Sequence, residues 1–515
     1  MALFRSGKNT AALIAVCLAS LMFGLEISSV PVILPTLQQV LHGGFKNLQW
    51  IMNAYTIACT TVLMAVGTLA DRYGRKRMLL FSLVLFGLTS LGCGLARDTA
   101  LLIAARFLQG VGGGAMLICQ VAALSHQFRD DAERSKAFGI WGIIFSIGLG
   151  FGPIIGGAIV ALSSWQWVFL VHVPLSLFTL LLAAGSVEES RDPQAKSLDL
   201  AGIVTLSLAV FGLSFYITQG PDLGLGSAAA IAILAAAAAS FAAFLRVERS
   251  RAHPMFDFSV FRIRNFSGAI MGSIGMNFSF WPFMIYLPMY FQSGLGYGVM
   301  PASLSLLAYT LPTLVVPPLA ERLVLRYEPH RIIPAGLFVI GLGFLLMKSG
   351  SGAANAGWLS LLPGCILAGT GLGMTNTPVT NTTTGAVSSD RAGMASGIDM
   401  SARLITLAIN IALMGFILLQ GILSHLRGAL PGAPAAALRV LAETIAGGGA
   451  VPPGELPATA VHAALSHGFG LVMLYGGIGV WLLAALSLMF FRGGRKAARA
   501  AGDAPLRRGE CGGAD

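Results

Sequence analysis

Residues 10–37 read TAALIAVCLASLMFGLEISSVPVILPTL, and this stretch decides the class of fold. Its one charged residue is Glu26, which lies 18 residues after Lys8 and 20 residues before Lys46. At about 1.5 Å per helical residue, each gap spans roughly 27 to 30 Å, the thickness of a bilayer core. We therefore predict a membrane-spanning helix here. The run is far longer than the apolar core of a cleavable signal peptide, so we expect it to be retained.

The composition of the whole chain points to the same class. The 515 residues are 55% hydrophobic and 11% charged, whereas soluble domains carry about 25% charged residues. The sequence therefore predicts an all-α integral membrane protein with fourteen spanning helices. They lie near residues 10–37, 48–70, 78–96, 99–124, 137–161, 165–186, 198–220, 227–245, 265–292, 301–320, 332–350, 357–386, 395–424 and 466–491.

Basic residues are distributed unevenly about these predicted helices. With the N-terminus inside the cell, the inside segments contain 26 of the 33 Lys and Arg residues. The positive-inside rule then favours a multi-pass protein of the bacterial inner membrane with both termini cytoplasmic. No nucleic acid is expected as a partner, because the net charge of +11 lies in short loops that flank helices. The longest outside segment, about residues 425–465, is expected to contain one short helix near 435–446.

A short charged loop follows the second predicted helix and reads GTLADRYGRKRMLL over residues 67–80. Gly67 would allow close approach of two helices, Asp71 could interact with a helix N-terminus, and Gly74 would permit a tight turn. A basic topology anchor is the alternative interpretation, but an anchor needs none of these three residues. The other members of the motif are Arg72 and Arg75.

The fourth predicted helix contains LIAARFLQGVGGGA, with Arg106 in apolar surroundings and Gln109 one turn later. A guanidinium stays charged, so within a bilayer it requires a partner or a wet cavity. The alternative is an Arg106 that only donates hydrogen bonds to helix carbonyls.

The fifth predicted helix contains GIIFSIGLGFGPIIGG, in which glycines recur every four residues. One face of the helix is thus free of side chains and suits close packing. We expect this face to contact a helix from the second half of the chain and the proline to allow a bend, with ordinary packing as the alternative. The residues are Gly148, Gly152, Pro153, Gly156 and Gly157.

Together and in this order, the three motifs resemble those of the major facilitator superfamily. The glycine stripe resembles the antiporter-associated element of its drug:proton antiporters, and fourteen helices resemble the larger branch of that group. The late segments AGTGLGMTNTPVTNTTTGAV and RAGMASGIDMSARL resemble the same branch. The resemblance implies a six-helix bundle over residues 1–190, two inserted helices over 191–250, a second six-helix bundle over 251–491 and a basic cytoplasmic tail over 492–515.

The resemblance also implies a function. We expect a monomeric secondary transporter that exports small lipophilic compounds, such as drugs, antiseptics and antibiotics, in exchange for protons. No enzymatic activity, cofactor or metal is expected, because the sequence lacks GxxxxGK[ST], HExxH and GxSxG. An exporter of an anionic metabolite or siderophore is the alternative, since two acidic and two basic residues balance within the predicted helices. A passive channel is a further alternative.

Glu26 is the expected proton carrier. Desolvation opposes the charged form of a carboxyl group, which would allow Glu26 to bind and release protons at physiological pH. If a proton and a substrate compete for one site, inward proton flow drives the substrate out. One proton crossing roughly 150 mV supplies about 3.4 kcal/mol for this purpose. The alternative is a permanently protonated Glu26 that hydrogen-bonds a neighbouring helix.

Other polar residues of the predicted helices carry less specific patterns. Asp399 and Arg403 lie four residues apart on one helical face. They are interpreted as a second proton site, a gate or a simple ion pair. His172 is interpreted as a packed, hydrogen-bonded histidine rather than a proton shuttle. Arg106 is expected to share in proton coupling. Candidates for the substrate cavity, with packing as the alternative, are Gln109, Asn277, Trp281, Tyr286, Asn376, Asn381 and Arg403.

Overall fold

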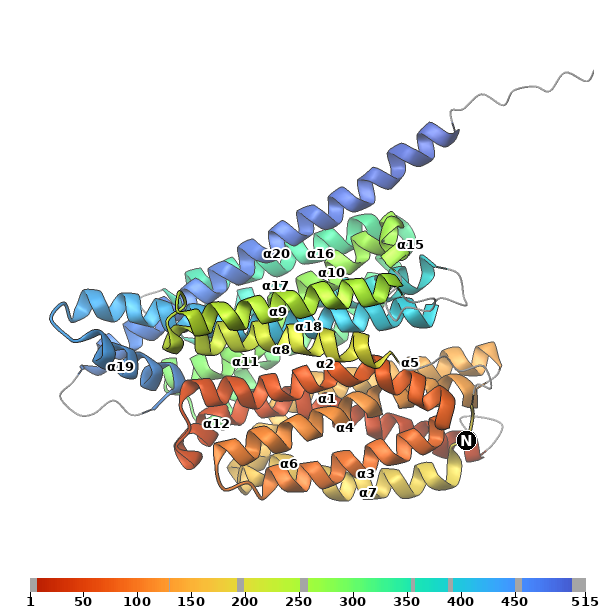
Figure 1. Cartoon of the computed structure of the whole chain (residues 1–515), viewed down its shortest axis with the longest axis horizontal. Helices are drawn as coiled ribbons and strands as arrows, with labels where there is room; N and C mark the ends of the chain where they lie inside the picture. The colour runs from red at the N-terminus through yellow and green to blue at the C-terminus, as the bar shows by residue number, and fades with distance from the viewer. Residues whose placement is uncertain are drawn as a thin grey trace, which may run out of the picture.

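The structure is a computed structural model that describes residues 7–128, 130–191, 199–250, 258–352, 357–387, 392–449 and 456–502. Every regular element in these ranges is helical. Most of the helices run side by side along the long axis of the molecule and form one bundle (Figure 1). The predicted all-α class is confirmed.

The first half consists of long helices whose bounds lie close to the predicted ones. The sixth predicted helix is divided at Val171, since Pro174 has no N–H to donate to the carbonyl of Leu170. The helices are α1 (Gly7–Leu41), α2 (Phe45–Tyr73), α3 (Arg75–Gly94), α4 (Thr99–Gln127), α5 (Asp131–Leu162), α6 (Gln166–Leu170) and α7 (His172–Ser186). Two further long helices follow, α8 (Leu200–Leu223) and α9 (Ala228–Ser250).

The second half is more interrupted, because prolines divide its first two predicted spans. Pro282 follows the break between α10 and α11, and Pro312 and Pro317 begin α14 and α15. The elements are η1 (Phe258–Arg262), α10 (Arg264–Phe278), α11 (Phe280–Met289), η2 (Tyr290–Gly294), α12 (Val299–Ser305), α13 (Leu307–Thr310), α14 (Pro312–Val315), α15 (Pro317–Tyr327), α16 (Pro329–Ser351), α17 (Trp358–Gly385), α18 (Ala392–Ala429), α19 (Ala435–Gly447) and α20 (Ala458–Gly502). The short helix α19 confirms the one predicted near residues 435–446.

Fourteen spans account for this bundle. Within the described residues, thirteen helical segments are long and apolar enough to cross a membrane. The fourteenth is α2, whose 29 residues extend over about 43 Å and pack against α4 and α18 inside the bundle. Helices α8 and α9 pack on each other, and α8 contacts both α2 and α18, so the inserted pair touches both six-helix halves. The domain boundaries themselves stay a prediction.

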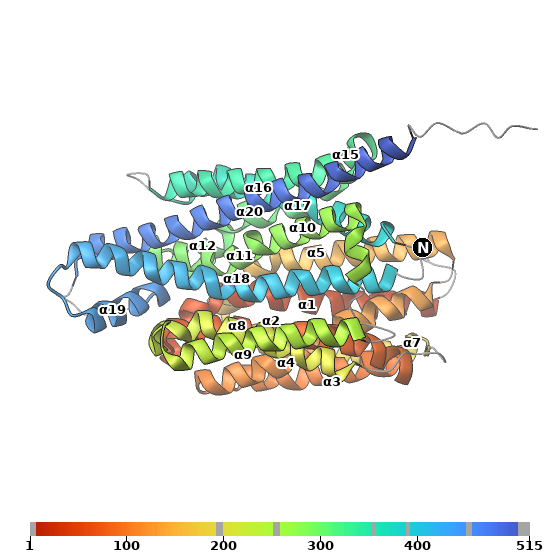
Figure 2. The same cartoon turned by 45° about the horizontal axis from the view of Figure 1, so that its top comes forward.

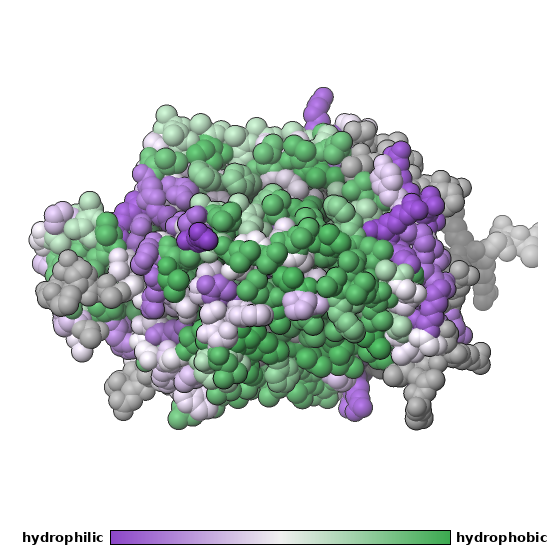
Figure 3. All heavy atoms as spheres, turned by 90° about the horizontal axis from the view of Figure 1, so that it is seen from below, coloured by the Kyte–Doolittle hydropathy of each residue, from purple (hydrophilic) through white to green (hydrophobic). Residues whose placement is uncertain are grey.

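The surface and the termini agree with a membrane-spanning bundle. Figures 1 and 2 show the start of α1 and the end of α20 at the same end of the bundle, with α19 at the opposite end. An apolar belt covers the middle of the face in Figure 3, and hydrophilic residues gather at both ends. An even number of spans follows from the two termini lying together.

The glycine stripe of α5 packs against α1, which corrects the prediction that it faces the second half. A Cβ on Gly148 would lie 2.9 Å from the carbonyl oxygen of Leu21, and one on Gly156 would lie 2.8 Å from Cβ of Ser29. Ser28 Oγ donates to the carbonyl of Gly148 at 3.0 Å, and a Cβ on Gly152 would overlap the same hydroxyl. Both helices thus approach to backbone contact within the first half.

Two neighbouring glycines of the same stretch do face the second half. A Cβ on Gly150 would meet Leu314 Cδ1 at 2.8 Å, and the carbonyl of Gly150 accepts a hydrogen bond of 2.8 Å from Thr310. A Cβ on Gly157 would overlap Ser303 of α12. The interface between halves therefore uses Gly157, which is among the predicted residues, and Gly150, which is not. Neither belongs to the repeat of Gly148, Gly152 and Gly156, because a four-residue repeat marks only one side of a helix.

The charged loop between α2 and α3 docks on the end of α7. Gly74 has φ +116°, and a Cβ there would lie 2.5 Å from Oε1 of Glu189. The N–H of Arg75 donates to the carbonyl of Ser190 at 2.9 Å. Gly74 therefore makes the predicted tight turn, whereas Gly67 shows no close approach: a Cβ there would be 3.9 Å from Ile118.

The other two predicted members of this motif, Asp71 and Arg72, lie in the last turn of α2 rather than in a loop. Arg72 is exposed, with its guanidinium 5.7 Å from the ring centroid of Tyr73. The side chain of Asp71 lies outside the described part of the chain. Its predicted contact with the other half stays a prediction.

Helix α19 covers the end of the bundle opposite the termini and joins the halves there. Arg439 and Glu443 of α19 form an ion network with Lys46 of α2 and Asp222 at the end of α8. The Lys46 to Glu443 distance is 3.3 Å. Near the same end, Gln292 Nε2 donates to the carbonyl of Val32 at 2.8 Å. This end of the bundle is closed.

The α1–α5 contact predicts opposite effects for two glycine substitutions on one helix. Gly156→Ala should lower the free energy of unfolding by about 1–3 kcal/mol, because its methyl group has no room against Ser29. Gly142→Ala should raise it by about 0.5–1 kcal/mol, because a Cβ there meets nothing within 4 Å. Thermal unfolding of the purified variants in detergent measures both. Equal stability of the two variants would contradict this packing.

Candidate functional site

Three buried side chains of the first half form a charge cluster: Glu26 of α1, Arg106 of α4 and His172 of α7. Nη1 of Arg106 forms an ion pair with Oε1 of Glu26, and Nε2 of His172 lies 3.0 Å from Oε2 of the same carboxylate. Their exposed fractions are 0%, 0% and 1%. Glu26 lies near the middle of a 35-residue helix, so the cluster lies at the depth of the bilayer centre.

Further hydrogen bonds hold Arg106 in place. Its Nε donates to the carbonyl of Ile51 at 3.1 Å, and Nη1 donates to Oε1 of Gln109 at 2.7 Å. Gln109 in turn donates to Oγ of Ser90 at 2.9 Å. The guanidinium carbon lies 4.3 Å from the ring centroid of Tyr55, a cation–π contact. Gln109 therefore belongs to the charge cluster, and Arg106 has far more than a carbonyl as its partner.

The cluster gives a physical reason for an ionisable group in the membrane. Burial opposes the carboxylate, but Arg106 and His172 favour it, so desolvation alone does not describe Glu26. Removing one partner of a buried ion pair costs about 3–5 kcal/mol. A proton added to Glu26 would leave the charge of Arg106 without its carboxylate in a site with no exposure. Protonation must therefore be accompanied by a rearrangement, which is the property a coupling site needs.

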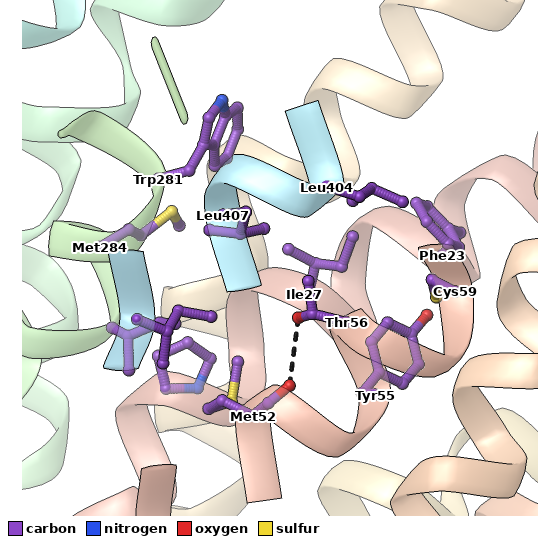
Figure 4. A pocket seen from close by; sticks show the side chains of 13 residues that line it. Phe23, Ile27, Met52, Tyr55, Thr56, Cys59, Trp281, Met284, Leu404 and Leu407 are labelled. Carbon is purple, nitrogen blue, oxygen red and sulfur yellow. Dashed lines mark hydrogen bonds between the residues drawn. The ribbon is translucent and has the colours of Figure 1, made fainter. Parts of the chain in front are cut away.

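A small cavity of about 30 Å³ lies beside the cluster, between the two halves (Figure 4). It has room for about one or two waters, far below the roughly 300–1,000 Å³ of a drug-sized site, so the halves occlude it in this conformation. Tyr55 both lines it and stacks on Arg106. The lining residues are Phe23, Ile27, Pro31, Met52, Tyr55, Thr56, Cys59, Trp281, Met284, Ile285, Leu404, Leu407 and Ile411.

Asp399 and Arg403 form the predicted pair on one face of α18, at 3.0 Å. Ser273 Oγ of α10 also donates to Asp399, so the carboxylate is held from two helices. Arg403 donates to Oδ1 of Asn376 at 2.6 Å and to Oγ1 of Thr380 at 3.0 Å. This second cluster joins α10, α17 and α18 and shares no residue with the cavity.

The remaining predicted cavity residues are dispersed. Trp281 lines the cavity, whereas Asn277 donates to the carbonyl of Ser273 at 3.0 Å. Tyr286 lies between the halves, where it accepts a hydrogen bond of 3.2 Å from Gln49 and donates to the carbonyl of Ile411. Asn381 is exposed. Of the seven predicted residues, Trp281 alone lines this cavity, because the others lie on different faces or at different depths of their helices.

Two side chains at this site were not selected for it by the sequence analysis. His172 is interpreted there as a packed, hydrogen-bonded histidine rather than a proton shuttle, and Tyr55 is not selected at all. The available signal for His172 was an ionisable residue within an apolar run, the same signal that selected Glu26. What the sequence could not provide is that α7 packs against α1 and α3, which brings His172 onto Glu26.

The bundle of long apolar helices around a buried charge cluster defines a polytopic membrane protein. A sequence profile of the Major Facilitator Superfamily matches residues 16–411. The chain belongs to the Major Facilitator Superfamily.

Two curated relatives and one solved structure illustrate the similarity. The multidrug resistance protein Stp of Mycobacterium tuberculosis (strain CDC 1551 / Oshkosh) is 34% identical over 423 residues, which cover 81% of this chain and 78% of Stp. The tetracenomycin C resistance and export protein of Streptomyces glaucescens is 30% identical over 518 residues, with 97% and 95% covered. The crystal structure of tetrameric PepTSo2 shares the fold, with a TM-score of 0.60 at 14% identity over 95% of this chain and 99% of that one.

The charge cluster predicts strong coupling between Glu26 and Arg106. Glu26→Gln and Arg106→Gln should each destabilise the protein by about 3–5 kcal/mol, whereas the double variant should lose much less than the sum, because no buried charge is left unpaired. Thermal unfolding of the four proteins gives the coupling energy. The exposed pair Lys8–Glu188, at 3.3 Å, is the control and should couple by at most about 1 kcal/mol. Additive losses at Glu26 and Arg106 would contradict the ion pair.

Proposed function

We propose that this transporter exports small lipophilic compounds in exchange for protons, with Glu26 as the proton-binding group. The observation that carries the proposal is a fully buried carboxylate, paired with Arg106, beside a cavity lined by apolar and aromatic side chains. Relatives named for multidrug resistance and for tetracenomycin C resistance and export support the substrate class. We place it in the bacterial inner membrane with cytoplasmic termini, on the distribution of Lys and Arg.

Tyr55 supplies a route by which a proton and a substrate exclude each other. Its ring contacts the Arg106 guanidinium on one side and lines the cavity on the other. Phe23 and Ile27, which flank Glu26 on α1, line the same cavity. When Glu26 accepts a proton, Arg106 loses its partner and shifts, and the cavity wall moves with it. Proton binding and substrate binding then favour different arrangements of one wall.

Export requires that the closed end of the bundle opens in turn. With the termini in the cytoplasm, the α19 end faces outside, so this structure is closed to the outside (Figure 1). The contacts of Gly150 with Leu314 and of Gly157 with Ser303 lie where α5 meets the second half. These small residues allow the halves to tilt while staying packed. Asp71 is proposed to steady the outward-open state through its loop.

The first transport prediction concerns Glu26. Glu26→Gln keeps the side-chain volume but cannot bind a proton, so it should abolish uphill export, while Glu26→Asp should keep part of it. Proteoliposomes with an imposed pH gradient and the lipophilic cation tetraphenylphosphonium measure this. Downhill counterflow of the same cation controls for folding. Uphill export by the Gln variant at the parent rate would remove Glu26 from the mechanism.

The cavity favours a lipophilic substrate over an anionic one, because its lining includes no charged side chain. Arg106 and Arg403 are both occupied by carboxylates, so neither is available to an anion without first losing its partner. A passive channel would need no such buried ion pair.

Trp281 tests the substrate class. Trp281→Ala removes the largest aromatic surface of the cavity and should weaken tetraphenylphosphonium binding by about tenfold, since aromatic contacts with a cation contribute on the order of 1–2 kcal/mol. Trp358→Ala, at a half-exposed position at the start of α17, is the matched control and should bind like the parent. Equilibrium binding to the purified protein decides it. Equal affinity of the two variants would place the substrate elsewhere.

A further inference from the structure

His172 is the member of the charge cluster that the export mechanism above leaves without a role. Its Nε2 lies 3.0 Å from Oε2 of Glu26, on the opposite oxygen from the one that pairs with Arg106. The ring is 1% exposed and meets the ring of Phe86 edge-on, with centroids 5.5 Å apart. Helix α7 packs between α1 and α3, so the imidazole is held against the carboxylate. A histidine that served only to fill space would not need to direct a ring nitrogen at the carboxylate of Glu26.

The two ring nitrogens of His172 are in different situations. Nδ1 is buried and has no hydrogen-bond partner among the described residues. A neutral ring with its proton on Nε2 fits this geometry, because Nε2 faces Oε2 of Glu26 at 3.0 Å and Nδ1 carries only a lone pair. The ring therefore presents one nitrogen to the carboxylate and a free basic nitrogen on its other side.

We propose that His172 and Glu26 together hold the transported proton, with His172 as the residue that passes it to the carboxylate. This rests on the proton exchange proposed above. Loading breaks one O–H bond of a hydronium ion from the outside solution and forms one Nδ1–H bond. Moving the Nε2 proton onto Oε2 of Glu26 then breaks one N–H bond and forms one O–H bond. No other covalent bond changes, and Arg106 is left without its carboxylate partner. The proton belongs to the pair rather than to either residue.

The surrounding groups explain why the pair carries the change in charge. Arg106 is a fixed cation on α4, so the three-residue cluster is neutral when empty and has a charge of +1 when loaded. The other titratable side chains at the cluster are Tyr55 of α2, which stacks on Arg106, Cys59 of α2, whose Sγ donates to the carbonyl of Gly110 at 3.2 Å, and Cys93 of α3, whose Sγ donates to Gln109 at 3.5 Å. Helix α6 contributes no titratable residue. None of these three forms an ion pair or hydrogen bond with the carboxylate of Glu26.

The test uses His172→Gln in proteoliposomes of the full chain. The Gln amide places an N–H near the position of Nε2 and so keeps a donor facing Glu26, but it cannot bind a proton. We expect uphill accumulation of tetraphenylphosphonium to fall by about tenfold or more and to lose its pH dependence. Binding and downhill counterflow should stay at the parent level. His126→Gln, at the end of α4 and outside the cluster, is the matched control.

The outcomes separate this inference from the function on which it rests. If Glu26→Gln abolishes uphill transport and His172→Gln behaves like the parent at every pH, His172 has only a structural role and the inference is overturned. If Glu26→Gln transports uphill, the proposed proton site fails and the inference fails with it. If His172→Gln does not fold, His172→Asn is measured instead, and uphill transport by that variant at the parent rate overturns the inference equally.

Discussion

The buried ion pair between Glu26 and Arg106 is the interaction on which the rest of this structure depends. It joins α1 to α4 at a point where neither side chain has exposed surface, and the hydrogen bonds of Arg106 extend it to α2 and, through Gln109, to α3. His172 adds α7 to the same point. Five of the six spans in the first half are therefore organised around one carboxylate. In the proposed mechanism, this carboxylate is the group that changes its charge.

The remaining span of the first half, α5, reaches the same region by a different kind of contact. Its glycine stripe lies on α1 at Leu21, Ser28 and Ser29, on either side of Glu26 in the sequence. Close backbone packing there fixes α1 from the side opposite the charges and leaves neighbouring positions of α5 for the second half. The motif associated with antiporters thus positions the helix that carries the carboxylate, and its link to the interface between halves runs through Gly150 and Gly157.

The sequence predicted the helices well because spanning segments are set by local composition. Apolar length and flanking charge located the spans, and only the prolines at positions such as 174, 282 and 312 introduced breaks that a hydropathy pattern does not register. Glu26 and Arg106 stood out for the same local reason. What the sequence could not predict was adjacency: which helix faces the glycine stripe, that His172 meets Glu26, and that Tyr55 lies between the cluster and the cavity. These contacts depend on how helices that are distant in the sequence pack together. For this reason, only one of the seven residues predicted to line the substrate cavity does so.

In the proposed mechanism, substrate binding and proton binding at Glu26 exclude each other. Proton-driven export follows from this competition. The most direct measurement adds tetraphenylphosphonium to the purified protein in weakly buffered detergent solution and follows the pH of the medium. The parent is expected to release protons as the cation binds, and the Glu26→Gln variant, which has no proton to give up at this position, is expected to release none. Binding by the parent with no release of protons would contradict this mechanism.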